Sequence, residues 1–486
     1  MTSTSCLPTR SRRIVQTGGL ILGPLVFAAL TLAPAPAGLA AAGWATAAVA
    51  AWMAIWWASE ALPLGATALL PLVLFPLLGI ADTAAAAAPF ANPLIFLFLG
   101  GFFIALAMQR WELHRRIALH VILRVGTRRR RLVAGAMIAT AGLSMWISNT
   151  ATAMMMMPIA LSLVSIPGAP HDDTDREQQN FSTAMMLGIA YGASIGGLGT
   201  LIGSPPNALL ASFMAQTYGV AIGFTDWMAI GLPTLLVLLP LTWLILTRLA
   251  FPFRESTRPE GAQPILEALR AMGPISRPER RVAAIFSLVA LAWIVNPLIA
   301  AWAGREPVSD TTIAVAGAVL LFAVPADWRR RDFLLNWDWA RRAPWEVLLL
   351  FGGGLSLARA IDQTGLAAWI GGGLDVFAQM PLLVLIAAVS VLVILLTEIT
   401  SNTATTVAFL PVIGALATAL AIDPMVLAAP AALAASCAFM LPVATPPNAI
   451  VYGTGHVTVA QMMRAGLILN LVGVIVITLV GALLIG

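Results

Sequence analysis

The chain has 486 residues, of which 59% are hydrophobic and 10% are charged, and its formal net charge is +5. Its long, non-alternating apolar runs predict membrane-spanning helices, which need about 20 apolar residues each, and they exclude a β-barrel and a large soluble domain. The basic residues gather between apolar runs, the pattern that sets membrane topology, so the charge does not indicate nucleic-acid binding.

The first apolar run, 17–34, follows a basic tail and contains Ala-x-Ala-like sites. This pattern fits either a cleaved signal peptide or a retained first span, and the topology below works best if it is retained. Further spans are expected at 42–59, 63–80 and 92–109. The basic, amphipathic stretch 110–131 is then expected to lie along the membrane surface.

The middle of the chain holds an apolar run, 132–165, with Ser148-Asn149-Thr150 near its centre. Two more apolar runs follow, at 181–219 (interrupted by "GTLIGSPPN", 199–207) and 227–250. A polar connection, 254–281, divides the chain. The second half repeats this order, with apolar runs at 282–303, 311–325, 346–371, 381–421, 426–455 and 463–485.

Arginine-rich segments at 110–131, 254–281 and 326–342 are assigned to the cytoplasm. This places the N-terminus inside and the C-terminus outside a bacterial inner membrane. The run 132–165 must then return to its own side as a re-entrant hairpin, and 381–421 must do so from the outside. The prediction is an all-α polytopic membrane protein with about eleven transmembrane helices and two hairpins. Its parts are a tail and first helix (1–41), a first repeat (42–253), a cytoplasmic linker (254–281) and a second repeat (282–486).

The two halves share a sequence pattern. "SNTATAMMMMP" begins at Ser148 and "SNTATTVAFLP" at Ser401, an offset of 253 that also aligns Ser144 with Thr397. After each motif comes a second pair, "GSPPNAL" from Gly203 and "ATPPNAI" from Ala444. Matched motifs in the same order indicate duplication. Because each half holds five membrane units, an odd number, the halves are expected to form an inverted repeat with a midplane site, as in secondary transporters.

The motifs favour ion and anion binding. Carbonyl and hydroxyl oxygens at a hairpin tip suit sodium, whereas free N–H groups at helix starts suit an anion. The alternative is that these polar residues only hydrogen-bond between helices and that the prolines only kink them. Glu398 precedes the second motif and has two interpretations, a sodium-site carboxylate or a hydrogen-bonded structural glutamate.

The doubled "SNTAT" with the two "PPN" motifs resembles the divalent anion/sodium symporter family (DASS, solute carrier 13-like) over nearly the whole chain. The resemblance implies at least two sodium ions, an elevator-type transport domain and a homodimeric scaffold. It implies one sodium site at Ser144, Ser148, Asn149 and Gly203, and another at Thr397, Ser401, Asn402 and Ala444. The carboxylates would meet Asn149, Thr150, Ser204, Asn402, Thr403 and Thr445, although Ser204 stands where the family usually has threonine.

The sequence therefore predicts a sodium-coupled symporter of C4-dicarboxylates such as succinate, malate or fumarate. Alternatives within the class are a sulfate or citrate symporter and a sodium/proton antiporter, for which Glu398 is the single core candidate. An enzyme is not expected, because the sequence shows no paired catalytic carboxylates, no metal-spaced histidines and no Ser-His arrangement. The expected partners are the anion, sodium, the lipid bilayer and a second copy of the chain.

Overall fold

The computed structural model describes residues 10–164, 174–254, 262–303, 308–373 and 379–485. Within them the chain is helical apart from one short antiparallel strand pair, β1 (Pro325–Asp327) with β2 (Asp332–Phe333). The helices of the first half are α1 (Arg10–Leu32), α2 (Ala41–Ser59), α3 (Leu64–Thr67), α4 (Leu70–Leu77), α5 (Thr83–Ala87), η1 (Ala88–Ala91), α6 (Pro93–Arg110), α7 (Leu113–Val125), α8 (Arg129–Ser144), α9 (Asn149–Val164), α10 (Thr174–Gly197), α11 (Pro205–Thr217), α12 (Phe224–Leu244), η2 (Ile245–Ala250) and α13 (Ala262–Met272).

The second half follows the same plan. Its helices are α14 (Arg277–Ala303), α15 (Asp310–Ala323), α16 (Trp337–Ala340), α17 (Trp345–Gln363), α18 (Leu366–Gly372), α19 (Leu382–Thr397), α20 (Asn402–Ala419), α21 (Pro424–Ala435), α22 (Pro446–Tyr452), α23 (Val459–Val480) and η4 (Gly481–Ile485). In the described chain, seven helices are long and apolar enough to cross a membrane, and one of these is α20. The all-helical membrane fold is confirmed, whereas the count of eleven spans stays a prediction.

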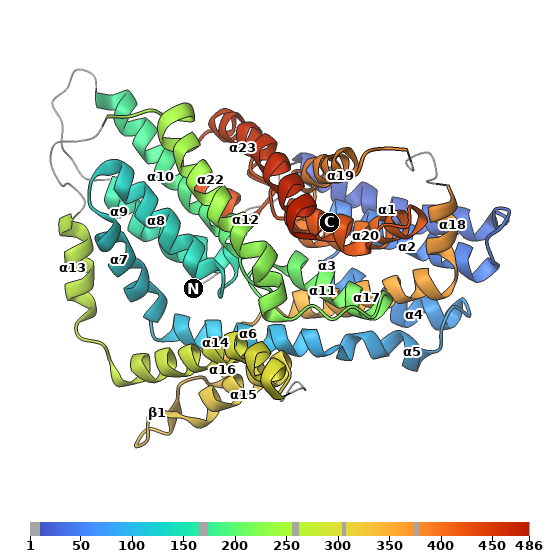
Figure 1. Ribbon diagram of the computed structural model, residues 1–486, viewed down its shortest axis with the longest axis horizontal. Coiled ribbons are helices and arrows are strands. Elements are labelled where there is room, and N and C mark those ends of the chain that lie inside the picture. The colour runs from blue at the N-terminus through green and yellow to red at the C-terminus, as the bar shows by residue number, and fades with distance from the viewer. Residues whose placement is uncertain (1–9, 165–173, 255–261, 304–307, 374–378, 486) are drawn as a thin grey trace.

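Both expected hairpins are present as pairs of helices joined by a short turn. The first hairpin is α8 and α9, and the second hairpin is α19 and α20. Both expected helix breaks are present as well, between α10 and α11 and between α21 and α22. The first hairpin starts from the end of the molecule where α7 and α13 lie, and the second starts from the opposite end, near α18 (Figure 1).

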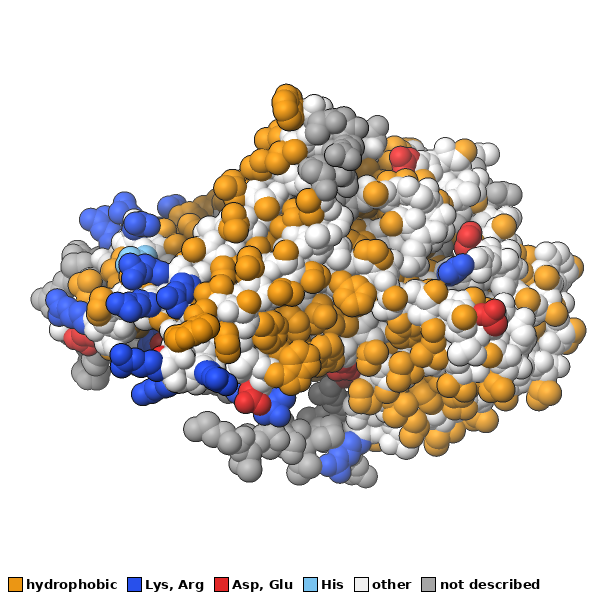
Figure 2. Space-filling model, turned by 90° about the horizontal axis from the view of Figure 1, so that it is seen from below, with side chains coloured by type: hydrophobic (Ala, Val, Ile, Leu, Met, Phe, Trp, Pro, Cys, Tyr) orange, Lys and Arg blue, Asp and Glu red, His pale blue; other side chains and the backbone are white. Residues whose placement is uncertain are grey.

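The end with α7 and α13 carries most of the arginine side chains in view, and we call it the arginine-rich end (Figure 2). Apolar side chains cover much of the surface between the two ends, which suits a face that meets lipid. Two ion pairs stabilise the arginine-rich end: Arg110 with Asp332 at 2.6 Å and Arg116 with Glu279 at 2.5 Å.

The centre of the fold is α10, which is buried from Phe181 to its end. Its glycines at 188, 192 and 196 recur every four residues, so they lie on one face of the helix. A Cβ on Gly196 would collide with the backbone of Ala141 in α8. Small residues let membrane helices approach closely in this way, and here they hold the first hairpin directly against the broken helix.

Three segments differ from the sequence prediction. The polar connection 254–281 contains a helix, α13, which packs against α7 and α9. The span expected at 346–371 is two helices, because Gly365 adopts a left-handed conformation (φ 75°) that begins α18 in a new direction. The span expected at 63–80 is divided between α3 and α4, where prolines enter the sequence.

Candidate functional site

The turn of the first hairpin is built around Ser144 and Asn149. α8 ends at Ser144 and α9 begins at Asn149, so the intervening residues form the tip. The Ser144 hydroxyl contacts Asn149 Oδ1 at 2.6 Å and donates to the Ala193 carbonyl of α10 at 2.7 Å. Ser148 Oγ accepts a hydrogen bond from the Ala151 amide, as a helix-capping serine does.

The turn of the second hairpin repeats this arrangement. The Thr397 hydroxyl contacts Asn402 Oδ1 at 2.7 Å and lies 2.9 Å from the carbonyl of Ala435, at the end of α21. Ser401 stands directly before α20, at the position that Ser148 holds before α9. Each hairpin therefore presents a hydroxyl, an asparagine and a carbonyl from the neighbouring broken helix.

The two helix breaks are also built alike. Asn207 Nδ2 donates to the carbonyls of Gly197 (2.9 Å), the last residue of α10, and Thr200 (2.8 Å), in the loop between α10 and α11. Asn448 Nδ2 donates to the carbonyls of Ala438 (3.1 Å) and Leu441 (3.0 Å) in the second break. In both asparagines the buried Oδ1 has no hydrogen-bond partner within the described chain. The asparagine of each "PPN" motif therefore fixes the carbonyls of its own break.

The oxygen atoms around Asn149 fit a cation. With its amide nitrogen turned toward them, Asn149 donates to Ser144 Oγ (2.6 Å) and to the carbonyls of Ala193 (3.2 Å) and Gly203 (3.3 Å). With the oxygen turned toward them, four oxygen atoms face one another, and a cation among them would stabilise this arrangement. In the described chain no three His, Cys, Asp or Glu side chains group as metal ligands, so neutral oxygens would hold the ion.

Glu398 has a structural role. Its carboxylate accepts hydrogen bonds from the backbone amides of Phe439, Met440 and Leu441, at 2.8–3.1 Å. Asn470 Nδ2 of α23 donates to it at 2.7 Å. These donors surround both carboxylate oxygens, which favours the structural interpretation over a sodium-site carboxylate.

The predicted anion-contacting residues differ in exposure. Asn149, Thr150, Asn402 and Thr403 are half-buried at the tips, where a ligand can reach them. Thr445 is buried, and its hydroxyl accepts from the Asn448 amide at the start of α22. Ser204 is also buried, and its hydroxyl lies 3.1 Å from that of Ser436, so it joins the two breaks.

Ser436 was not identified from the sequence. It lies outside both repeated motifs, and its partner is 232 residues away. Tyr191 was missed for the same reason: its hydroxyl donates to the Phe439 carbonyl at 2.8 Å and so joins α10 to the second break. No pattern in the local sequence marks such contacts.

Equivalent positions of the two repeats differ in exposure. Met154 of α9 is 56% exposed, whereas its equivalent Val407 of α20 is 5% exposed. Val443, before α22, is 74% exposed, whereas its equivalent Ile202, before α11, is 8% exposed. The two repeats are therefore alike in sequence, but these equivalent positions have different surroundings in the structure.

Comparison of the sequence with known proteins identifies the family of this chain. The family model described as "Sodium:sulfate symporter transmembrane region" matches residues 16–485. The chain belongs to this family. Among curated members, the "Sodium-dependent dicarboxylate transporter SdcS" of Staphylococcus saprophyticus is 42% identical over 475 residues, which cover 97% of this chain and 92% of the relative. The protein of the same name from Staphylococcus aureus strain USA300 is 42% identical over 96% of this chain and 90% of its own length.

Two solved structures share the fold of this family member. The YdaH transporter of Alcanivorax borkumensis aligns with a TM-score of 0.61 at 15% identity, covering 97% of this chain and 98% of that one. MtrF of Neisseria gonorrhoeae aligns with a TM-score of 0.57 at 13% identity over 97% of each chain. At such low identity these matches concern the fold alone. The family-model match and the 42% identity to the SdcS relatives confirm the resemblance to the divalent anion/sodium symporter family.

Proposed function

We propose that the protein is a sodium-coupled symporter of C4-dicarboxylates. The observation that carries the proposal is the paired tip, Ser144 with Asn149 and Thr397 with Asn402, each beside a carbonyl of a broken helix. The printed function of the two SdcS relatives, sodium-dependent dicarboxylate transport, supports it, because they match almost the whole chain at 42% identity.

Each tip would hold one sodium ion, so that two ions are transported with each anion. The first ion would be bound by Ser144, Ser148, Asn149 and the Gly203 carbonyl, and the second by Thr397, Ser401, Asn402 and the Ala444 carbonyl. The oxygen atoms gathered around Asn149 support the first site. Because neither the SNT motifs nor the PPN motifs contain an arginine, lysine or histidine, the bound ions themselves would supply the positive charge that a dianion requires.

The anion would lie between the two tips. Asn149 and Thr150 would contact one carboxylate and Asn402 and Thr403 the other, and their partial exposure leaves them accessible. Thr445 and Ser204 would act at the starts of α22 and α11, where free backbone N–H groups favour an anion. Their burial makes them less direct contacts than the four tip residues.

Transport would follow an elevator-type alternating-access cycle, with the hairpins and broken helices moving as one body. The bonds from Tyr191 to Phe439 and from Ser204 to Ser436 support such a body, since they join the two repeats. Access would alternate between the arginine-rich end, which we assign to the cytoplasm, and the opposite end. The N-terminus would then be cytoplasmic, the C-terminus outside, and the functional unit a homodimer in a bacterial inner membrane.

Sulfate is the second candidate substrate, because the matching family model is described by sodium:sulfate symport. Citrate is a third candidate substrate. Ser204 is smaller than the threonine that is usual at this position in the divalent anion/sodium symporter family, and a smaller side chain leaves more room for a larger anion. A sodium/proton antiporter is disfavoured, because both carboxylate oxygens of Glu398 already accept hydrogen bonds, from four donors in all.

The deciding experiment is uptake of labelled succinate into proteoliposomes containing the purified protein. An inward sodium gradient should drive accumulation, and a potassium gradient should not. Unlabelled malate and fumarate should compete, whereas sulfate and citrate should compete weakly. Sodium-driven uptake of sulfate in preference to succinate would replace the dicarboxylate assignment, and uptake without sodium would refute the coupling.

A further inference from the structure

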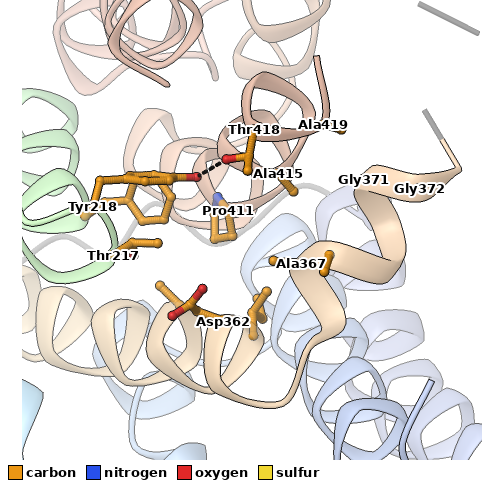
Figure 3. Close-up of a pocket in the computed structure, with 14 residues that line it drawn as sticks. Thr217, Tyr218, Asp362, Ala367, Gly371, Gly372, Pro411, Ala415, Thr418 and Ala419 are labelled. Carbon is orange, nitrogen blue, oxygen red and sulfur yellow. Dashed lines mark hydrogen bonds between the residues drawn. The ribbon is translucent and has the colours of Figure 1, made fainter. Parts of the chain in front are cut away.

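A cavity lies away from the hairpin tips. It has a volume of about 370 Å³ and is lined by residues of α11, α17, α18 and α20, together with Tyr218, which ends α11 (Figure 3). Its walls are mainly Ala, Gly, Ile, Phe and Pro residues, and the proline is Pro411, which lies within α20. Ligand pockets are commonly of this size and are mostly apolar with a few polar groups.

The polar groups of this cavity are few and face one another. Asp362 projects from α17 into the space, and Tyr218 and Thr418 lie on the wall across from it (Figure 3). The hydroxyls of Tyr218 and Thr418 are 3.3 Å apart and share a hydrogen bond. Thr217 adds a third hydroxyl to the lining.

Asp362 is the one charged residue among those that line the cavity. In the described chain its carboxylate forms no ion pair and accepts no hydrogen bond, and it is exposed to solvent. At the equivalent position of the first repeat, 253 residues earlier, stands Gln109, which is neutral. The repeat therefore does not require an acid here, and the negative charge is particular to this cavity.

The cavity also joins two parts of the fold. α11 and α20 belong to the broken helix and hairpin that form the proposed transport body, whereas α17 packs against α3 and α18 packs against α2. The cavity lies at the end of the molecule opposite the arginine-rich end, where α18 is found (Figure 1). A molecule bound here would contact both parts at once.

We propose that this cavity is a binding site for a small organic cation, a primary ammonium on a single ring or short branched chain. Its ammonium would pair with the Asp362 carboxylate, while its apolar body would fill the space between α18 and α20 and reach toward the hydroxyls of Tyr218 and Thr418 on the opposite wall. A dicarboxylate is excluded as the occupant, because Asp362 would repel it.

Occupancy would inhibit transport. This part of the inference rests on the proposed elevator cycle, because a ligand that bridges α17 and α20 stabilises the arrangement in which they are adjacent. Because the cavity lies at the end opposite the arginine-rich end, the ammonium would act from the outside. Succinate at high concentration would not displace it, because succinate would bind elsewhere, between the hairpin tips. Binding itself does not depend on the transported substrate.

Binding is tested with the full-length protein in lipid nanodiscs by titration calorimetry, with benzylammonium as the probe and benzyl alcohol as its neutral counterpart. We expect saturable binding of benzylammonium that is about two- to fivefold tighter than that of the alcohol, since partly exposed ion pairs contribute about this much. Asp362→Asn should remove the preference, and Asp338→Asn, an exposed acid on α16, should leave it intact. Ala368→Phe, which fills the cavity from α18, should weaken both ligands.

Three results would overturn the proposal. Equal binding of the two probes would indicate an apolar occupant such as a lipid chain. An unchanged preference in Asp362→Asn would place the ammonium elsewhere, and no saturable binding would remove the site.

Inhibition is tested in proteoliposomes. External benzylammonium should lower the maximal rate of succinate uptake without raising KM, and Asp362→Asn should take up succinate but resist inhibition. If wild-type protein takes up no succinate, the proposed function fails, while the calorimetry still judges the cavity.

Discussion

Asn448 provides a sharp test of how the second helix break is held for ion binding. Replacing it by leucine keeps nearly the same volume in a fully buried position but removes the amide that donates to the carbonyls of Ala438 and Leu441. Leu441 O keeps the Ala444 amide as a second donor at 3.2 Å. Among the described residues, Ala438 O accepts from Asn448 alone.

The size of the effect follows from these contacts. Losing the bond to Leu441 costs about 1 kcal/mol, and leaving Ala438 O buried without a donor costs about 1–3 kcal/mol. The ordered break is therefore destabilised by about 2–4 kcal/mol, a factor of roughly 30 to 700 in its population. Because Ala444 supplies a proposed sodium ligand from this break, we expect at least a tenfold rise in the sodium concentration that half-activates succinate uptake.

The assay is the sodium dependence of succinate uptake in proteoliposomes, together with the Tm of the purified protein. Asn296→Leu is the matched control, because Asn296 is also buried and donates to a carbonyl, that of Val308, but lies on α14. The control should lower the Tm and leave sodium activation unchanged. If Asn448→Leu lowers the Tm but activates at the wild-type sodium concentration, the break does not position a sodium ligand and the reasoning is wrong.

Three further predictions concern other residues. Glu398→Gln should lower the Tm markedly, since a neutral amide cannot accept hydrogen bonds from all four donors. The uptake that remains should keep its sodium dependence, and a stable protein with altered sodium stoichiometry would restore the sodium-site interpretation. Thr150→Val and Thr403→Val should each raise the KM for succinate about 10- to 150-fold, because each loses a hydrogen bond to a charged group; an effect at only one threonine would mean that a single repeat holds the anion. With Cys6 replaced by serine, a cysteine at Gln363 should react with an impermeant thiol reagent from outside, and one at Arg131 only after permeabilisation; the reverse labelling would invert the topology.

The local architecture of the site was predictable from the sequence. The offset of 253 residues between the SNT motifs located both hairpins, and the structure has their helices at Arg129–Val164 and Leu382–Ala419, close to the expected 132–165 and 381–421. The polar residue four positions before each motif, Ser144 or Thr397, indeed contacts the asparagine of the turn. These features follow from local chain geometry and from duplication, which a single sequence records.

The long-range contacts were not predictable. Nothing near Glu398 in the sequence distinguishes a carboxylate that binds sodium from one that accepts backbone amides about 40 residues later. The cavity at Asp362 depends on how four helices pack, and no local periodicity encodes such packing. The assignment of ligands to individual residues, the inverted orientation of the repeats and the dimer stay predictions.

The seam between α8 and α10 limits how the substrate can gain access. With glycine at position 196 against the Ala141 backbone, the first hairpin sits at main-chain contact distance from the broken helix, and Ser144 is bonded across the same seam. A hairpin that swung open like a flap would break the Ser144–Ala193 bond and dismantle the oxygens around Asn149 each time it moved. A permanent seam of this kind is suited to a carrier whose ion site stays assembled while the surroundings change, and any side chain larger than hydrogen at position 196 should wedge it apart.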